Sequence, residues 1–145
     1  MGGAGATGAL LLVATTLIHY EALRALGALL PRLGMPSRAR LIVVIVGTFV
    51  AHAVEIVLYA AAARALARWP GGGSLGPTDA LPFDRVLYFS AETYTSLGYG
   101  DVLPHGPLRM LAGSEALNGL LLIGWSASFI HVAMERFRHL DGRAE

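Results

Sequence analysis

The residues with the clearest chemical potential form one short segment, Thr95-Ser96-Leu97-Gly98-Tyr99-Gly100-Asp101. Its chemistry would come from backbone carbonyl oxygens, because a dehydrated alkali cation needs a cage of oxygen ligands in place of its water. Consecutive carbonyls can face one side only if the backbone conformation alternates. Gly98 and Gly100 allow this, since glycine adopts positive φ without a steric penalty. The segment therefore predicts a backbone cation site.

A second group of residues places ionisable side chains within apolar segments. Its members are His19, Glu21, His52, Glu55 and Glu115. Such side chains usually pair with each other or face a cavity. Because His52 and Glu55 share one helix face, we expect them to meet Glu21 or Arg24 in a polar clamp between helices. The alternative is a carboxylate–histidine metal site, although a second Glu-x-x-His motif is missing.

The composition of the chain is that of a membrane protein. Hydrophobic residues make up 54% of its 145 residues, charged residues make up 14%, and the mean hydropathy is +0.57. The net charge of +1 does not indicate a nucleic-acid partner. The absence of cysteine excludes disulfides and thiolate chemistry. We find no Ser-His-Asp set, no phosphate loop and no sign of a small-molecule substrate, so the chain is not expected to be an enzyme.

Three segments are long and apolar enough to span a bilayer, at about residues 8–30, 41–63 and 108–133. Pro31, Gly34 and Pro36 interrupt the chain after the first span, and Ser37 is a candidate N-cap for the second. No basic residue precedes the first apolar run, so we expect a retained helix rather than a cleaved signal peptide. No span carries arginine at every third position, so a voltage sensor is not expected.

Arginine placement predicts the orientation of these spans. The loop 31–40 and the C-terminal tail are rich in arginine, which makes both cytoplasmic under the positive-inside rule. The N-terminus and the connection 64–107 then lie outside a cell (inner) membrane that the chain crosses several times.

The outer connection contains two different parts. Residues 69–81 are rich in glycine and predict a flexible loop. Residues 82–97 are apolar, aromatic and compatible with a helix that Asp84 could cap. A helix of about 12 residues reaches only about 18 Å, roughly half of a membrane. Followed by Gly98 and Gly100, it indicates a re-entrant loop that lines a water-filled path.

Within these elements, residues 95–101 resemble the selectivity-filter signature of potassium channels, and residues 38–138 resemble the family's two-helix pore module. The resemblance implies an all-α membrane protein with three transmembrane helices plus a re-entrant pore helix and filter loop. It also implies a homotetramer in membrane lipid that conducts K+ passively, without an organic cofactor. K+ would bind the carbonyls of Ser96, Leu97, Gly98 and Tyr99, and the Ser96 hydroxyl. Ser96 and Leu97 replace the commoner Thr and Val but keep these groups.

The same resemblance assigns supporting residues around the filter. Tyr99 would point away from the axis and brace the filter against Tyr88 and Phe89. Glu92 lies nine residues before Asp101, and in similar channels such a pair shares a hydrogen bond and a proton. We therefore expect a Glu92–Asp101 pair.

Gating candidates lie on the third span. Gly119 and Gly124 stand where similar channels have hinge glycines, with close helix packing as the alternative. Ala127, His131 and Glu135 recur every four residues and share a helix stripe. By resemblance this stripe faces the axis, and His131 would form a titratable four-fold ring. The alternative is an interfacial histidine that anchors the helix end.

The predicted organisation is an accessory helix and loop over residues 1–36, a pore domain over 37–138 and a short tail over 139–145. Two other functions stay open. One is a membrane metal-binding or redox protein that uses the His/Glu group, and the other is a regulatory subunit of another channel.

Overall fold

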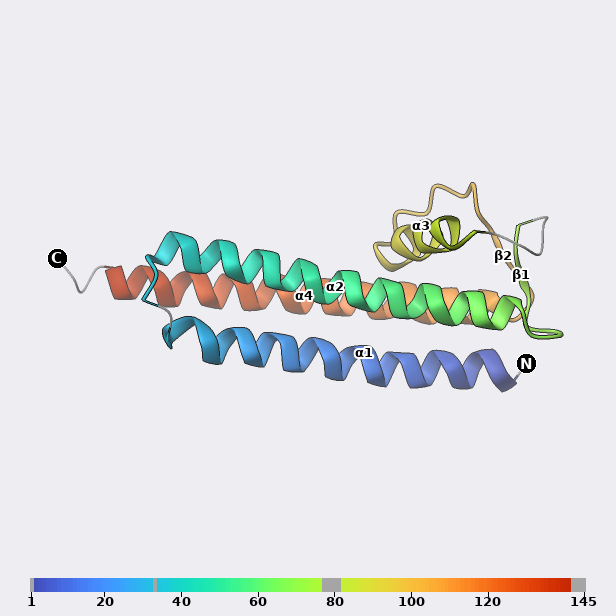
Figure 1. Cartoon of the computed structure of the whole chain (residues 1–145), viewed down its shortest axis with the longest axis horizontal. Coiled ribbons are helices and arrows are strands. Elements are labelled where there is room, and N and C mark those ends of the chain that lie inside the picture. The colour runs from blue at the N-terminus through green and yellow to red at the C-terminus, as the bar shows by residue number, and fades with distance from the viewer. Residues whose placement is uncertain (1, 33, 77–81, 142–145) are drawn as a thin grey trace.

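The computed structural model describes residues 2–32, 34–76 and 82–141, with side chains up to residue 136. Three long helices run side by side (Figure 1): α1 (Gly2–Leu29), α2 (Ser37–Ala67) and α4 (Leu108–Asp141). The 3₁₀ turn η1 (Leu30–Arg32) ends the first of them, and the short helix α3 (Phe83–Tyr94) lies near one end of the bundle. The predicted all-α class is confirmed.

The three long helices are the predicted membrane spans. Within the described residues, Gly3–Arg32, Ser37–Ala67 and Leu108–Arg136 are each long and apolar enough to cross a membrane. Much of their surface is apolar and exposed, as in Leu10, Phe49 and Leu121. Apolar side chains on the outside of a bundle are stable against lipid and costly in water. The chain is therefore a multi-pass membrane protein.

Successive spans alternate in direction. The N-terminus and α3 lie at one end of the bundle, whereas the α1–α2 connection and the C-terminal end of α4 lie at the other (Figure 1). This arrangement agrees with the predicted pairing of ends; which end faces the cytoplasm stays a prediction. The predicted tail extends beyond Asp141, where residues lie outside the described part of the chain.

Prolines set the starts of α2 and α3. The N-cap positions are Pro36 and Pro82, both with extended backbone (φ −64° and −63°) and without a side-chain cap hydrogen bond. The predicted caps at Ser37 and Asp84 are therefore wrong: Ser37 is the first helical residue, and Asp84 lies in the first turn of α3. Proline fixes its own φ and leaves the helix to begin at the next residue.

The connection between α2 and α3 is more ordered than predicted. The two-residue strands β1 (Ser74–Leu75) and β2 (Pro104–His105) pair antiparallel, and Leu75 is buried. Gly73 permits the close approach, because it has a φ of +103° and an added Cβ would lie 2.3 Å from the His105 carbonyl oxygen. Residues 77–81 of the predicted loop lie outside the described residues.

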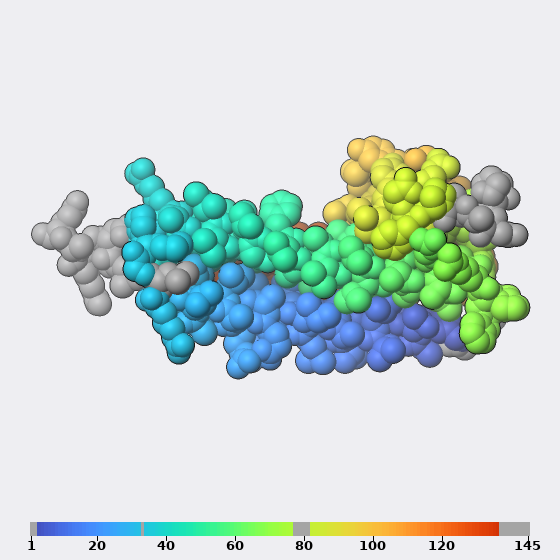
Figure 2. Space-filling view, in the orientation of Figure 1, coloured from blue at the N-terminus to red at the C-terminus, as the bar shows by residue number. Residues whose placement is uncertain are grey.

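The main core lies between α2, α3 and α4. Its largest fully buried apolar side chains are Tyr59, Tyr94, Leu108 and Leu111. Helix α1 packs against α2 and α4 on the side opposite α3 (Figure 1). As Figure 2 shows, α3 and the loop after it project from the side of the long helices. Helix α3 and the loop after it therefore pack on α2 and α4, and the pairing of β1 with β2 joins the two ends of this projecting segment.

Candidate functional site

The end of α3 turns the chain sharply into the segment 95–101. The carbonyl of Glu92 accepts hydrogen bonds from the backbone N–H groups of Leu97 (2.8 Å) and Gly98 (3.3 Å), and the carbonyl of Thr93 accepts one from Ser96 (3.0 Å). These bonds satisfy carbonyls that a helix C-terminus otherwise leaves unpaired. They also tie the segment directly to the last turn of α3.

The backbone of this segment alternates in conformation. Ser96, Gly98 and Gly100 have positive φ values of 57°, 56° and 79°. The predicted positive φ at the two glycines is confirmed. Ser96 was not predicted, because its side chain makes the left-handed region rare. Every second residue of the segment is thus in the conformation that allows consecutive carbonyls to be turned toward one side.

Among the residues that the structure describes, none covers this segment. All residues from Thr95 to Asp101 are exposed, including 57% of Leu97 and 69% of Tyr99. Large apolar groups exposed on an otherwise ordered loop mark an interaction surface. The surface lies on the face of the bundle that α1 leaves open (Figures 1 and 2).

Glu92 and Asp101 bind different donors. The buried Glu92 accepts a hydrogen bond at Oε2 from the backbone N–H of Tyr99 (3.0 Å). Asp101 accepts one at Oδ1 from the Tyr88 hydroxyl (3.3 Å). The Glu92 carboxylate thus binds the Tyr99 N–H, and the Asp101 carboxylate binds the Tyr88 hydroxyl, in place of the predicted Glu92–Asp101 hydrogen bond. Desolvation and the Asp101 charge raise the pKa of Tyr88, so its hydroxyl keeps the proton that it donates.

The two predicted bracing residues on α3 face different surroundings. Phe89 is 4% exposed and belongs to the core between α2, α3 and α4. Tyr88 is 40% exposed and lies beside Asp101. Contact between Tyr99 and Tyr88 stays a prediction, while Phe89 supports the segment only from within the core.

Comparison with known proteins places the chain in a family. The model of a family described as ion channel matches residues 41–136, about two thirds of the chain. The chain belongs to the ion channel family. The matched residues fall inside the predicted pore domain and include α3 and the segment 95–101. A membrane location agrees with the three spans.

One curated relative of the channel is the inward rectifier potassium channel Kirbac3.1 of Paramagnetospirillum magnetotacticum. The two are 38% identical over 55 residues, which cover 37% of this chain and 19% of the relative. The chain thus spans about a fifth of that protein's length. No solved structure matches the channel sequence significantly.

The two candidate hinge glycines of the channel have different surroundings. At Gly119, an added Cβ would lie 2.0 Å from the carbonyl oxygen of Tyr94, so α4 and the end of α3 are in close contact there. At Gly124, nothing lies within 4 Å of an added Cβ. Close packing, the predicted alternative, accounts for Gly119; a hinge at either position stays a prediction.

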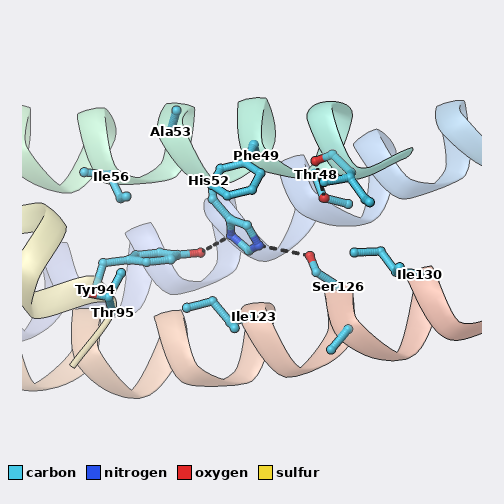
Figure 3. Close-up of a pocket in the computed structure, with 12 residues that line it drawn as sticks. Thr48, Phe49, His52, Ala53, Ile56, Tyr94, Thr95, Ile123, Ser126 and Ile130 are labelled. Atoms are coloured by element: carbon cyan, nitrogen blue, oxygen red, sulfur yellow. Dashed lines mark hydrogen bonds between the residues drawn. The ribbon is translucent and has the colours of Figure 1, made fainter. Parts of the chain in front are cut away.

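The stripe on the last part of α4 is partly exposed. His131 Nε2 lies 3.7 Å from Glu135 Oε1, and both side chains are more than half exposed. Ala127 lines a cavity of about 440 Å³ together with Thr95, Ile123 and Ser126. The cavity lies under the end of α3 (Figure 3). Whether the stripe faces a conduction axis stays a prediction.

A buried polar cluster joins all four helices of the channel. Glu55 accepts hydrogen bonds from His19 Nδ1 (2.9 Å) and from the Tyr94 hydroxyl, and its Oε2 lies 3.2 Å from His52 Nδ1. Ser126 Oγ contacts both imidazoles. The cluster forms a polar clamp, but with His19 in place of the predicted partners from the first span.

Those two predicted partners pair with each other instead. Arg24 and Glu21 form an exposed salt bridge of 2.6 Å on the outer side of α1. The helical rotation that buries His19 turns them outward, because residues two and five positions along lie on other faces.

A second buried set contains Glu115, one of the ionisable residues expected to have a partner, together with residues that were not predicted. Asn118 donates hydrogen bonds to Thr15 (2.6 Å) and to the Tyr59 hydroxyl (3.2 Å), and Ser90 is hydrogen-bonded to Glu115. Asn118 and Thr15 carry no charge, so only their position in an apolar span could have drawn attention to them. Together with the clamp, the Asn118–Thr15 bond fixes α1 against α2 and α4.

Proposed function

We propose that this chain is the pore-forming subunit of a potassium-selective channel that works as a homotetramer. The observation that carries the proposal is the alternation of positive φ at Ser96, Gly98 and Gly100, directly after a 12-residue half-helix in a membrane protein. Such a backbone allows consecutive carbonyl oxygens to be turned toward one side. Conduction is passive and involves no chemical step by the protein.

The mechanism follows from the ligands. Carbonyls of Ser96, Leu97, Gly98 and Tyr99 replace the water of a dehydrating K+ ion, and each chain supplies one quarter of every ring of oxygens. The C-terminal end of α3 adds the negative end of its helix dipole below the filter. Four chains complete the cage, which accounts for the exposure of the whole segment in a single chain.

Two further observations support potassium as the ion. The relative from Paramagnetospirillum magnetotacticum is named as a potassium channel. In addition, Ser96 and Leu97 leave the backbone ligands and one hydroxyl in place although they differ from the commoner filter residues. The positive loop 31–40 supports an orientation with that loop and the C-terminus in the cytoplasm.

A flux assay on the purified chain in liposomes tests the proposal. We expect K+ flux well above Na+ flux, and block by Ba²⁺, which has a similar size and twice the charge. Flux from the lone chain would also exclude a regulatory subunit. A monomer or dimer in mild detergent, or equal flux of both ions, would contradict the proposal.

The variant Gly98→Ala tests the segment itself. Its φ of +56° makes alanine strained there by about 1–2 kcal/mol, which turns a carbonyl out of line. The matched control is Gly71→Ala, whose φ of +77° imposes similar strain outside the filter and which also has open space around it. We expect selectivity to be lost in Gly98→Ala and kept in Gly71→Ala. Unchanged selectivity in Gly98→Ala would show that this loop is not the filter.

A further inference from the structure

The clamp brings two imidazoles and a carboxylate to one buried point. His19 Nδ1 and His52 Nδ1 lie 2.9 and 3.2 Å from the two oxygens of Glu55. The three side chains offer ligand atoms that all lie within 4.8 Å of one another. His19 and Glu55 are fully buried, and 17% of the His52 side chain is exposed. Two imidazoles and a carboxylate are a common ligand set for zinc.

The other ring nitrogens converge as well. His52 Nε2 lies 3.0 Å from Ser126 Oγ, and His19 Nε2 lies 3.1 Å from the same oxygen. Both Nδ1 atoms therefore point to one carboxylate, while both Nε2 atoms point to one hydroxyl. A metal-ligating histidine normally donates its other N–H to an oxygen that fixes the orientation of the ring. Ser126 is such an oxygen for both rings.

This arrangement leaves the Nδ1 atoms of both rings directed at the same carboxylate. If a cation lies between them, both Nε2–H groups can donate to the two lone pairs of the Ser126 hydroxyl oxygen.

We propose that His19, His52 and Glu55 bind one divalent transition-metal ion, of which Zn²⁺ fits best by ligand type. Four-coordinate zinc holds neighbouring ligand atoms about 3.3 Å apart. The hydrogen-bonded pairs therefore need to separate by a few tenths of an ångström, and the other ligand atoms, all within 4.8 Å of one another, need to move closer. The Tyr94 hydroxyl lies 2.9 Å from His52 Nδ1 and bonds to Glu55, so it can serve as the fourth ligand.

The site has an entrance and a structural consequence. His52, Tyr94 and Ser126 line the cavity of about 440 Å³, so an ion reaches the site through His52 (Figure 3). Tyr94 is the last residue of α3, and the filter segment begins at Thr95. A bound ion would therefore tie α1 and α2 to the base of the filter. The zinc site does not depend on the conduction pathway, so a protein that failed to conduct K+ would still bind zinc.

Calorimetric titration of the full-length chain in detergent, after chelator treatment, tests the site. We expect saturable binding of about one Zn²⁺ per chain and no comparable binding of Mg²⁺. Co²⁺ in the same site should give the visible absorption of a four-coordinate ion.

Variants separate the inner ligands from their support. We expect Glu55→Gln and His52→Ala to lose the saturable site and the Co²⁺ bands. Ser126→Ala should keep the bands but bind about 10–100-fold more weakly, as for the loss of an outer hydrogen bond. His131→Ala is the matched control, since His131 lies outside the cluster and pairs with Glu135.

Two results would overturn the proposal. The first is absence of saturable Zn²⁺ binding by the unmodified chain. The second is Zn²⁺ binding of equal affinity in Glu55→Gln, Ser126→Ala and the unmodified chain, all shown to be folded by circular dichroism and gel filtration. Glu55→Gln keeps the shape of the side chain, so loss of the site there cannot be assigned to a cavity.

Discussion

Replacing Gly119 with alanine tests how closely α4 must approach the end of α3. An alanine Cβ would lie 2.0 Å from the Tyr94 carbonyl oxygen and 2.8 Å from its carbonyl carbon. Real Cβ atoms essentially never approach closer than 3.0 Å, so about 1 Å of movement is required. The clashing atoms belong to the backbone, and rotation of a side chain cannot relieve them. The end of α3, and the filter segment with it, must shift.

The magnitude follows from comparison with Gly124→Ala. Both variants gain about 1 kcal/mol of helix propensity, and this gain cancels between them. Gly124 has nothing within 4 Å of an added Cβ, so only Gly119→Ala has an overpacking cost, which is about 1–3 kcal/mol. For a chain of this length, that difference corresponds to an unfolding temperature about 2–12 °C lower.

Thermal unfolding of both variants in the same detergent measures the difference, and liposome flux measures its effect on conduction. We expect Gly119→Ala to melt below the unmodified chain and to lose K+ preference, and Gly124→Ala to melt at or above it. An unfolding temperature of Gly119→Ala equal to that of Gly124→Ala would refute the packing argument. If both variants melted alike but changed open probability, a hinge on α4 would account for both glycines.

Three other changes have defined outcomes. Glu92→Ala leaves the Tyr99 N–H without its acceptor, which costs about 1–3 kcal/mol. The conducting periods should therefore shorten more in Glu92→Ala than in Glu92→Gln. Equal open times of the two variants in single-channel records would contradict this. Asn118→Ala removes the bond to Thr15 and should lower the free energy of unfolding by about 1–3 kcal/mol, which an unchanged melting curve would disprove. Open probability should rise on cytoplasmic acidification in the unmodified chain but not in His131→Ala; a response that persists in the variant places the sensor elsewhere.

The spans could be predicted from the sequence because bilayer thickness demands a fixed length of apolar helix. Their ends could not. The first span was expected at about residue 8, whereas α1 begins at Gly2, and α2 continues to Ala67 rather than residue 63. Helical hydrogen bonding continues through residues that are not apolar enough to count toward a span. Hydropathy therefore locates the part inside the lipid, not the helix.

The segment 95–101 shows a similar division between residue type and tertiary context. Gly98 and Gly100 could be assigned positive φ from residue type alone, since glycine is the residue that adopts it freely. Ser96 has the same sign of φ, and its residue type argues against that conformation. It is held by the hydrogen bond from its N–H to Thr93 and by the bonds of the next two residues to Glu92. The context of the turn overrides the local preference.

The buried clamp depended most on tertiary structure. The sequence by itself determined that ionisable side chains such as His52 and Glu55 would need polar partners, because lipid provides none. It did not determine that His19, rather than Glu21 or Arg24, would be that partner, nor that Tyr94 and Ser126 would complete the cluster. Those choices depend on the rotation of each helix about its axis. A rotation that buries His19 exposes its neighbours, and it is set by the packing of α1 against α2 and α4.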